Sequence, residues 1–426
     1  DSADGNTGVG TGVFGALTTG DNNVAVGLNA LDVNTTGCRN VAVGCGSLDA
    51  NTTGNNNTAL GKDALGLNTT AANNTAVGYE SLSKNTTGTS LTAIGQLALA
   101  ENTTADNNTA VGRLALYLNT TGAENVAVGS HALQKNTTGG VNVGIGLCAL
   151  CSNTTASNNV GIGGFSLCTN TTGTGNTATG INTLRFNTTA SDNTAYGQNA
   201  LKANTTASGN VAVGSLAGQA ITTGHSQTAL GFCALTTATT PEGNTALGNS
   251  AMKLTTTGAD NVAVGRRALC TNTTGGNNTS IGPYTMTSNT TGAGNVAVGI
   301  QALCSNTTAS SNTAVGLDAL KTNTTGIENV AVGSASLDAN TTGDYNVAVG
   351  ANSLSANTTG DINTGIGVAA LRDNTTGTEN VAVGRSALLV NTTGNSNTAV
   401  GCGSLDANTT ASQNTAMGYE SMGVTS

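Results

Sequence analysis

The stretch that decides the fold runs from Asn40 to Asn56 and reads NVAVGCGSLDANTTGNN. The same pattern fills the rest of the chain with the same spacing. Its first glycine, Gly44, belongs to a series that recurs every 17 residues from Gly10 to Gly418, which makes 25 units without an insertion or a deletion. A short, fixed period of this kind indicates a solenoid.

The length and composition of the unit predict strands. Two helices and a turn need roughly 33 residues, twice the length of this unit. Val and Thr favour extended backbone, and the Gly and Asn between them favour turns. The sequence therefore predicts an all-β chain, a single-stack parallel β-solenoid (β-roll) whose coils each contain two or three short strands. We expect residues 1–426 to form one continuous repeat domain, a segment of a longer fibre.

The composition excludes several classes of protein. The 426 residues include 60 Gly, only 2% aromatic residues and only 8% charged residues, where an ordinary domain has about 25% charged residues. The net charge is −9 with no basic patch, so nucleic acid is not an expected partner. No apolar run approaches the roughly 20 residues that span a bilayer, so we expect no membrane span in this chain.

Three columns of equivalent residues are expected to build the core. A bulky residue precedes each repeat glycine, as in Val43, and a second apolar column contains Leu48 and its equivalents. Burying one residue of each kind stabilises a coil by about 3–5 kcal/mol, less than the entropy cost of ordering 17 residues, so the coils must stack to fold. The residue between the two outer strand positions is always small, which indicates either a thin core or a contact with another chain. This strand-Ala column, the candidate packing column, begins with Ala25, Ala42, Ala59, Ala76 and Ala93.

Two asparagine columns punctuate each coil. The first precedes the strand, as in Asn40, and the second opens Asn-Thr-Thr in 20 of 24 coils. Asn favours turns, and stacked Asn amides form ladders between chains or coils; Asn-Thr-Thr is also an N-glycosylation acceptor. We favour the ladder, because where Leu17, Ile221, Ala238 or Thr255 replaces the Asn, both threonines remain. The second Asn column, a ladder or a glycosylation row, contains Asn34, Asn51, Asn68, Asn85, Asn102, Asn119, Asn136, Asn153, Asn170, Asn187, Asn204, Asn272, Asn289, Asn306, Asn323, Asn340, Asn357, Asn374, Asn391 and Asn408.

The motif Asn-Val-Ala-Val-Gly, as in Asn23 to Gly27 and Asn40 to Gly44, resembles the head repeat of trimeric autotransporter adhesins (the YadA-like head). The resemblance occurs once per coil along the whole chain. It implies a left-handed parallel β-roll, three chains side by side, and a head that binds surface glycans or a host receptor. The coil here is longer than is usual in that family, because it adds the Asn-Thr-Thr-Gly arm.

No constellation of residues indicates catalysis, a metal or a cofactor. The two histidines, His131 and His225, occupy different places in unrelated coils, whereas a catalytic or metal site needs converging groups. Among nine cysteines, Cys151 and Cys168 are 17 residues apart and share a column in adjacent coils. Their expected Cα separation of about 4.8 Å predicts a disulfide in an oxidising location.

These observations lead to a structural or adhesive role without catalysis. We expect an extracellular filament or fibre segment on a cell surface or virion, self-associated as a parallel homotrimer or filament. A receptor-binding viral or phage fibre of the same architecture is the first alternative. An ice-binding β-solenoid is the second alternative, because regular Thr arrays on such folds match ice. Against it, adjacent Thr-Thr in a strand points the two hydroxyls to opposite sides.

Overall fold

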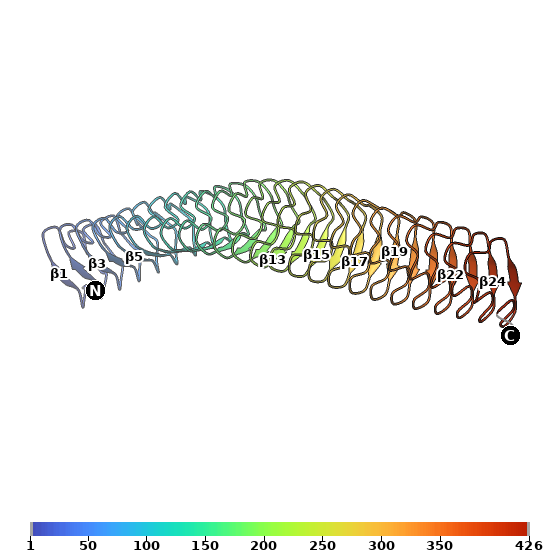
Figure 1. Cartoon of the computed structure of the whole chain (residues 1–426). Helices are drawn as coiled ribbons and strands as arrows, with labels where there is room; N and C mark the ends of the chain where they lie inside the picture. Colours follow the sequence, from blue (N-terminus) through green and yellow to red (C-terminus); the bar gives the residue numbers. More distant parts are fainter. Residues whose placement is uncertain (1–2, 424–426) are drawn as a thin grey trace. The chain divides into compact units, whose positions relative to one another are not determined.

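Each 17-residue unit forms one coil, and each coil contains one strand of three residues. The computed structural model describes residues 3–423, and the chain divides into two compact units, Asp1–Asn210 and Val211–Ser426. Within each unit the strands follow one another as parallel neighbours in one ladder (Figure 1). The prediction of an all-β parallel solenoid is confirmed, whereas one domain over residues 1–426 stays a prediction.

The first unit contains strands β1 to β12 among its described residues. Their bounds are β1 (Thr7–Val9), β2 (Val24–Val26), β3 (Val41–Val43), β4 (Thr58–Leu60), β5 (Thr75–Val77), β6 (Thr92–Ile94), β7 (Thr109–Val111), β8 (Val126–Val128), β9 (Val143–Ile145), β10 (Val160–Ile162), β11 (Thr177–Thr179) and β12 (Thr194–Tyr196).

The second unit contains strands β13 to β25 in the part that the structure describes. Their bounds are β13 (Val211–Val213), β14 (Thr228–Leu230), β15 (Thr245–Leu247), β16 (Val262–Val264), β17 (Thr279–Ile281), β18 (Val296–Val298), β19 (Thr313–Val315), β20 (Val330–Val332), β21 (Val347–Val349), β22 (Thr364–Ile366), β23 (Val381–Val383), β24 (Thr398–Val400) and β25 (Thr415–Met417).

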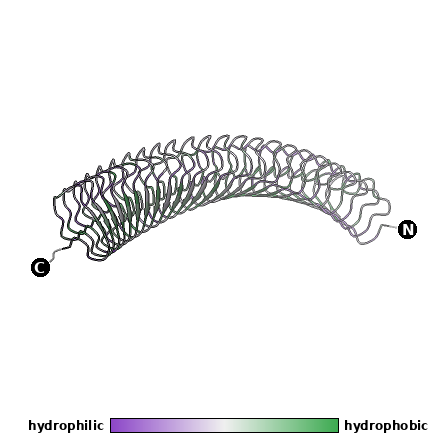
Figure 2. Cartoon of the chain, turned by 90° about the vertical axis from the view of Figure 1, so that its right-hand side faces the viewer, coloured by the Kyte–Doolittle hydropathy of each residue, from purple (hydrophilic) through white to green (hydrophobic). Residues whose placement is uncertain are grey.

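The register keeps every column of the repeat aligned. Ala25 pairs with Ala42 between β2 and β3, and Ala331 pairs with Ala348 between β20 and β21. Hydrophobic and hydrophilic positions therefore recur at the same place in successive coils (Figure 2). Because identical columns stack, a favourable contact made in one coil is repeated in the next.

The core contains the strand-Ala column and the Leu column, and the expectation that Val43 and its equivalents are buried is wrong. Ala42 and Leu48 are fully buried, whereas Val43 is 36% exposed. The reason is the thinness of the coil. A Cβ added to Gly144, which stands in the strand-Ala column, would lie 3.2 Å from Cγ of Leu133, so the Leu fills the space in front of the strand and admits only a small residue.

The rest of the coil turns through left-handed backbone, which explains why each coil has one strand rather than two or three. In the coil that begins at Asn57, Asp63 and Leu65 have φ of 55° and 52°, a region that bulky residues rarely adopt. The repeat glycine is more restricted still. Gly27 has φ of 134°, and a Cβ there would lie 2.6 Å from the carbonyl oxygen of Gly44 in the next coil, so only Gly fits this column.

Candidate functional site

The second Asn column is a buried ladder of side-chain amides. Nδ2 of Asn51 donates to Oδ1 of Asn34 in the preceding coil over 2.8 Å and to the carbonyl of Gly54 in its own coil over 3.1 Å. The same Gly54 carbonyl accepts a bond from Nδ2 of Asn40, at 2.8 Å. Asn34, Asn40 and Asn51 have no exposed surface. Each ladder residue thus satisfies buried polar groups both within its coil and between coils.

This arrangement repeats over long runs in both units. The amide links run without a break from Asn34 to Asn204 in the first unit and from Asn272 to Asn408 in the second. A glycan would have to replace a hydrogen of an Nδ2 that already donates to two buried acceptors. The geometry therefore favours a ladder over a row of N-glycans in the folded chain.

Four coils replace the second asparagine, and their replacements identify this column as a core position. Ile221, Ala238 and Thr255 have no exposed surface, and Leu17 is half-buried. An apolar side chain here cannot donate to the preceding ladder residue, and the buried Oδ1 of Asn204, one coil before Ile221, has no hydrogen-bond partner among the described residues. Thr255 keeps a polar group of its own in the column, and its buried Oγ1 also has no hydrogen-bond partner among the described residues.

The first Asn column acts on the backbone. The N–H of Asn40 donates to Oδ1 of Asn23 over 2.9 Å, and the N–H of Asn57 donates to Oδ1 of Asn40 over 2.9 Å. Leu91 replaces the asparagine in one coil, and its N–H still donates to Oδ1 of Asn74, at 2.9 Å. Each asparagine of this column therefore holds the start of the strand in the following coil.

The two threonines of each coil have different surroundings. Oγ1 of Thr52, in the inner Thr column, donates to the carbonyl of Thr69 in the next coil over 3.1 Å. Thr53, in the outer Thr column, is exposed. The outer column is Thr in all 24 coils, from Thr19 to Thr410. Both threonines lie outside the three-residue strand of their coil, so the alternation along a strand does not apply to them, and the opposite directions of the two hydroxyls stay a prediction.

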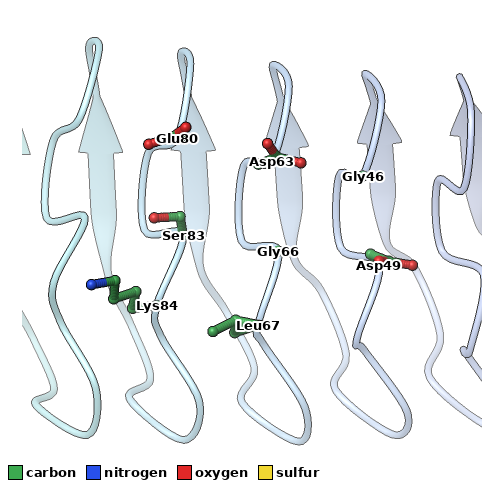
Figure 3. A pocket seen from close by; sticks show the side chains of 8 residues that line it. All are labelled: Gly46, Asp49, Asp63, Gly66, Leu67, Glu80, Ser83 and Lys84. Atoms are coloured by element: carbon green, nitrogen blue, oxygen red, sulfur yellow. The ribbon is translucent and has the colours of Figure 1, made fainter.

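One depression lies in the first unit on the corner that follows the repeat glycine (Figure 3). It has a volume of about 250 Å³, and three successive coils contribute its lining. Three carboxylates surround it, from Asp49, Asp63 and Glu80. Burial, together with the negative charges of Asp32 and Asp63, raises the pKa of Asp49. The lining residues are Gly46, Asp49, Asp63, Gly66, Leu67, Glu80, Ser83 and Lys84.

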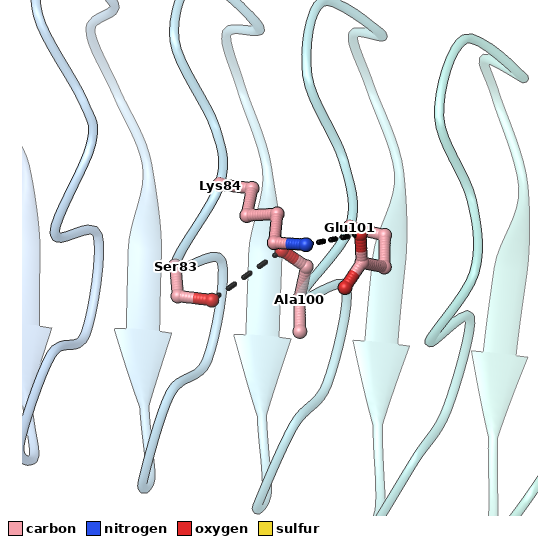
Figure 4. Close-up of polar contacts among 4 residues, drawn as sticks. All are labelled: Ser83, Lys84, Ala100 and Glu101. Carbon is pink, nitrogen blue, oxygen red and sulfur yellow. Dashed lines mark hydrogen bonds and ion pairs between the residues drawn. The ribbon is translucent and has the colours of Figure 1, made fainter.

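Polar contacts between coils continue from the lining of this depression. Nζ of Lys84 lies 2.7 Å from a carboxylate oxygen of Glu101, one coil further on, and Oγ of Ser83 donates to the carbonyl of Ala100 over 3.4 Å (Figure 4). Lys84 is exposed, and its hydrogen bond with Glu101 raises the pKa of Lys84. Among residues 3–423, no group of three or more His, Cys, Asp or Glu side chains has a metal-binding arrangement.

The strand-Ala column is part of the core of its own chain. The alternative interpretation, that this column contacts another chain, is therefore wrong. Ala25, Ala42, Ala59, Ala76 and Ala93 are each fully buried in the single chain. The outward strand stripe, formed by the first and last residue of each strand, is exposed or half-buried instead. Its first residue is Thr or Val, and its last residue is apolar or Tyr in every described strand except β11. Leu60 and Ile94 in this stripe are 38% and 41% exposed.

The predicted cysteine pair is brought together. Cys151 and Cys168 are half-buried thiols whose Sγ atoms lie 3.3 Å apart in adjacent coils. The two histidines are not brought together in one unit, since His131 belongs to the first unit and His225 to the second. His131 contacts Oγ of its neighbour Ser130 through Nδ1 over 2.7 Å.

Comparisons with known proteins add no relative. The chain matches no protein-family model, and a comparison with curated proteins finds no similar sequence. Among residues 3–423, no helix has the length and apolar character needed to cross a bilayer. The absence of catalysis and the left-handed sense of the coil stay predictions.

Proposed function

We propose that this chain is a structural segment of an extracellular fibre, and that copies associate side by side through the outward strand stripe. The observation that carries the proposal is the stripe itself. Val330 and Val332 lie at its two edges in β20, and Val347 and Val349 repeat them in β21. The last position of the strand, which is apolar or Tyr in every described strand except β11, offers a partner chain of the same period a matching surface.

The coil supports a fibre role because its bonding is axial. Backbone N–H groups, Asn amides and Thr hydroxyls all donate from one coil to the next, as Thr341 does twice to the carbonyl of Thr358. These bonds resist separation of the coils along the stack. The resemblance to trimeric adhesin heads supports a parallel trimer that binds surface glycans or a receptor, with the chains meeting at the stripe rather than at the strand-Ala column.

The oligomeric state tests the proposal. The single chain has a mass of 41.4 kDa, so sedimentation equilibrium should give a multiple of this mass. Val332→Glu with Val349→Glu places two charges on the stripe and should dissociate the assembly. The matched control is Thr342→Glu with Thr359→Glu, on the exposed outer Thr column. A monomeric wild-type chain, or equal effects of the two double variants, would contradict side-by-side association.

The location of the fibre separates the structural reading from its closest alternative. Antibodies against the chain should label the surface of the cells that produce it. Labelling of virus or phage particles instead would identify a receptor-binding viral fibre of the same fold.

Ice binding is a second candidate that one observation favours. The outer Thr column presents one exposed threonine per coil, as in Thr36, Thr53 and Thr70, at the regular spacing of about 4.8 Å between strands. Thermal hysteresis of the purified chain measures this activity. Its loss on Thr→Lys substitution of three adjacent outer threonines would assign the ice-binding surface, and a wild-type chain without hysteresis would eliminate the candidate.

A further inference from the structure

Cys151 and Cys168 occupy equivalent places in adjacent coils of the first unit, directly after the Leu column. The backbone around them is in register, because the N–H of Ser152 donates to the carbonyl of Cys168 over 3.1 Å and the N–H of Lys135 to that of Cys151 over 3.1 Å. Adjacent strands lie about 4.8 Å apart, inside the range of about 4.4–6.8 Å that Cα atoms have across a disulfide. The two Sγ atoms are already in contact at 3.3 Å.

The other cysteines of this column lack such a neighbour. Cys270 and Cys304 are separated by two coils, which corresponds to about 9.6 Å and exceeds the span of a disulfide. Cys148 lies three residues before Cys151 and interacts with its thiol. Cys151 and Cys168 are both half-buried, so small reagents in solvent reach them.

We propose that Cys151 and Cys168 form a modification site, a reversible disulfide that joins two adjacent coils. The proposal does not depend on the fibre role of the chain.

The polar surroundings distinguish the two thiols. The hydrogen bond between the two thiols lowers the pKa of Cys168 to about 7, against the opposing effect of burial, and the charges of Arg185 and Lys135 act in the same direction as the bond. The same bond, together with burial, raises the pKa of Cys151. Because the thiolate is the attacking species in disulfide exchange, Cys168 is the better nucleophile near neutral pH.

The reaction with a small disulfide such as oxidised glutathione then has two steps. The Cys168 thiolate attacks one glutathione sulfur, forms a mixed disulfide and releases one glutathione thiolate. Cys151 loses its proton to solvent and attacks the Cys168 sulfur, which forms the Cys151–Cys168 bond and releases the second glutathione. The two cysteines lose two electrons and two protons, and the oxidised glutathione becomes two reduced molecules.

Incubation of the full chain with defined ratios of oxidised and reduced glutathione, followed by acid quenching and alkylation, tests the pair. Trypsin leaves Cys148, Cys151 and Cys168 in one peptide that ends at Arg185, and chymotrypsin then cuts after Phe165 to separate Cys168 from the other two. We expect a linked Cys151–Cys168 peptide that disappears in both Cys151→Ser and Cys168→Ser. Free thiols in strongly oxidising buffer, or a bond between Cys148 and Cys151, would overturn the pairing.

Two further measurements test the order of reaction and the link between coils. Competitive alkylation of the reduced chain at pH 7 should modify Cys168 at least about 10-fold faster than Cys151 or Cys304; faster reaction at Cys151 would overturn the assignment of the first thiol. A bond that closes a 17-residue loop should slow local opening of the two joined coils about 100-fold, measured as hydrogen exchange of the Ser152 amide before and after oxidation. Unchanged exchange in the oxidised chain would contradict a coil-to-coil link.

Discussion

Two stretches of the second unit are built from coils of the same kind but have different residues in the second Asn column. The interrupted stretch, residues 211–260, has Ile221, Ala238 and Thr255 in this column, and the continuous stretch, residues 261–413, has asparagine in every coil. The backbone bond between inner threonines is nevertheless similar. It measures 2.9 Å from Thr222 to Thr239 in the interrupted stretch and 2.9 Å from Thr341 to Thr358 in the continuous one.

The comparison separates what the fold requires from what stabilises it. The inner Thr hydroxyl also keeps its bond in both stretches, at 3.1 Å from Thr222 to Thr239 and 3.0 Å from Thr341 to Thr358. The Asn ladder is therefore an addition to a coil that the backbone and the inner threonines already hold. A buried column of this kind is stable when it is fully paired or fully apolar, and weakest where one polar group lacks a partner.

The repeat glycine should be indispensable in both stretches, which gives the largest expected effect. A Cβ on Gly248 or Gly350 would lie 2.5 Å from the carbonyl oxygen of the next repeat glycine, and both residues have φ of at least 130°. We expect Gly248→Ala and Gly350→Ala each to cost about 4 kcal/mol, from backbone strain and the clash together. Hydrogen exchange of amides in the affected coils measures the loss, and a cost below about 1 kcal/mol at either site would contradict the close approach.

Removing one amide from the continuous stretch should have the next largest effect. Asn340→Ala leaves Oδ1 of Asn323 without its donor and removes one of the two acceptors of Nδ2 of Asn357, bonds of 2.8 and 3.0 Å. With both groups buried, we expect a cost of about 3 kcal/mol in local stability. Hydrogen exchange within these coils measures it, because opening of a repeat protein is local.

Two matched variants sharpen this result. Asn272→Ala removes the first member of the run, where only the bond from Asn289 crosses to a neighbouring ladder residue, and should cost about 1 kcal/mol less than Asn340→Ala. Thr342→Ala, on the exposed outer Thr column, should change stability by less than about 0.5 kcal/mol. Equal costs for all three would show that the ladder does not contribute as a connected series.

The sequence predicts the period and the columns but not the direction in which each strand faces. Alternation along Val41, Ala42 and Val43 defines two faces, and ordinary hydrophobicity assigns the valines to the core. In the structure the valines face outward and the alanine faces the core, because Leu48 and its equivalents occupy the space in front of the strand. That steric limit depends on where the turns place the Leu, which the strand pattern does not contain.

The turns themselves illustrate the same limit. A Leu with positive φ costs energy locally, so local propensity does not predict φ of 49° at Leu48. Stacking makes the conformation favourable, since Leu48 is fully buried. The second Asn column was easier to interpret, because Ile221 and Leu17 among its replacements already indicate an inward position. The pairing of Cys151 with Cys168 followed from the period alone.

The unpaired hydroxyl in the interrupted stretch predicts a substitution that increases stability, with a smaller effect than the losses above. Thr255→Val removes the buried Oγ1 that has no hydrogen-bond partner and keeps the shape of the side chain, so it should stabilise the coil by about 1 kcal/mol. Thr256→Val is the matched control, because Oγ1 of Thr256 donates to the carbonyl of Thr273 over 3.0 Å. The control should lose about 1 kcal/mol. Hydrogen exchange measures the change in local stability for each variant. Changes of opposite sign for Thr255→Val and Thr256→Val would confirm that the pairing of the hydroxyl decides the effect, and changes of equal sign would contradict it.

The smallest expected effect concerns pH. Nε and Nη2 of Arg372 donate to the two carboxylate oxygens of Asp373 over 2.8 Å each, and these bonds lower the pKa of Asp373. Because the folded-state pKa of Asp373 is lowered, the ion pair stabilises the fold above the unfolded-state pKa of about 3.9. This stabilisation is lost as the pH falls through the folded-state value. The two side chains are 44% and 36% exposed, so solvent screening limits the contribution to about 0.5 kcal/mol.

The ladder should behave differently under the same titration, because an amide has no proton to gain in this range. The cost of Asp373→Asn should therefore fall towards zero below about pH 4, while the cost of Asn340→Ala stays constant from pH 7 to pH 3. Hydrogen exchange of both variants against the wild-type chain at the two pH values measures the difference. A cost of Asn340→Ala that falls in parallel with that of Asp373→Asn would mean that charge, rather than the neutral amide ladder, stabilises the continuous stretch.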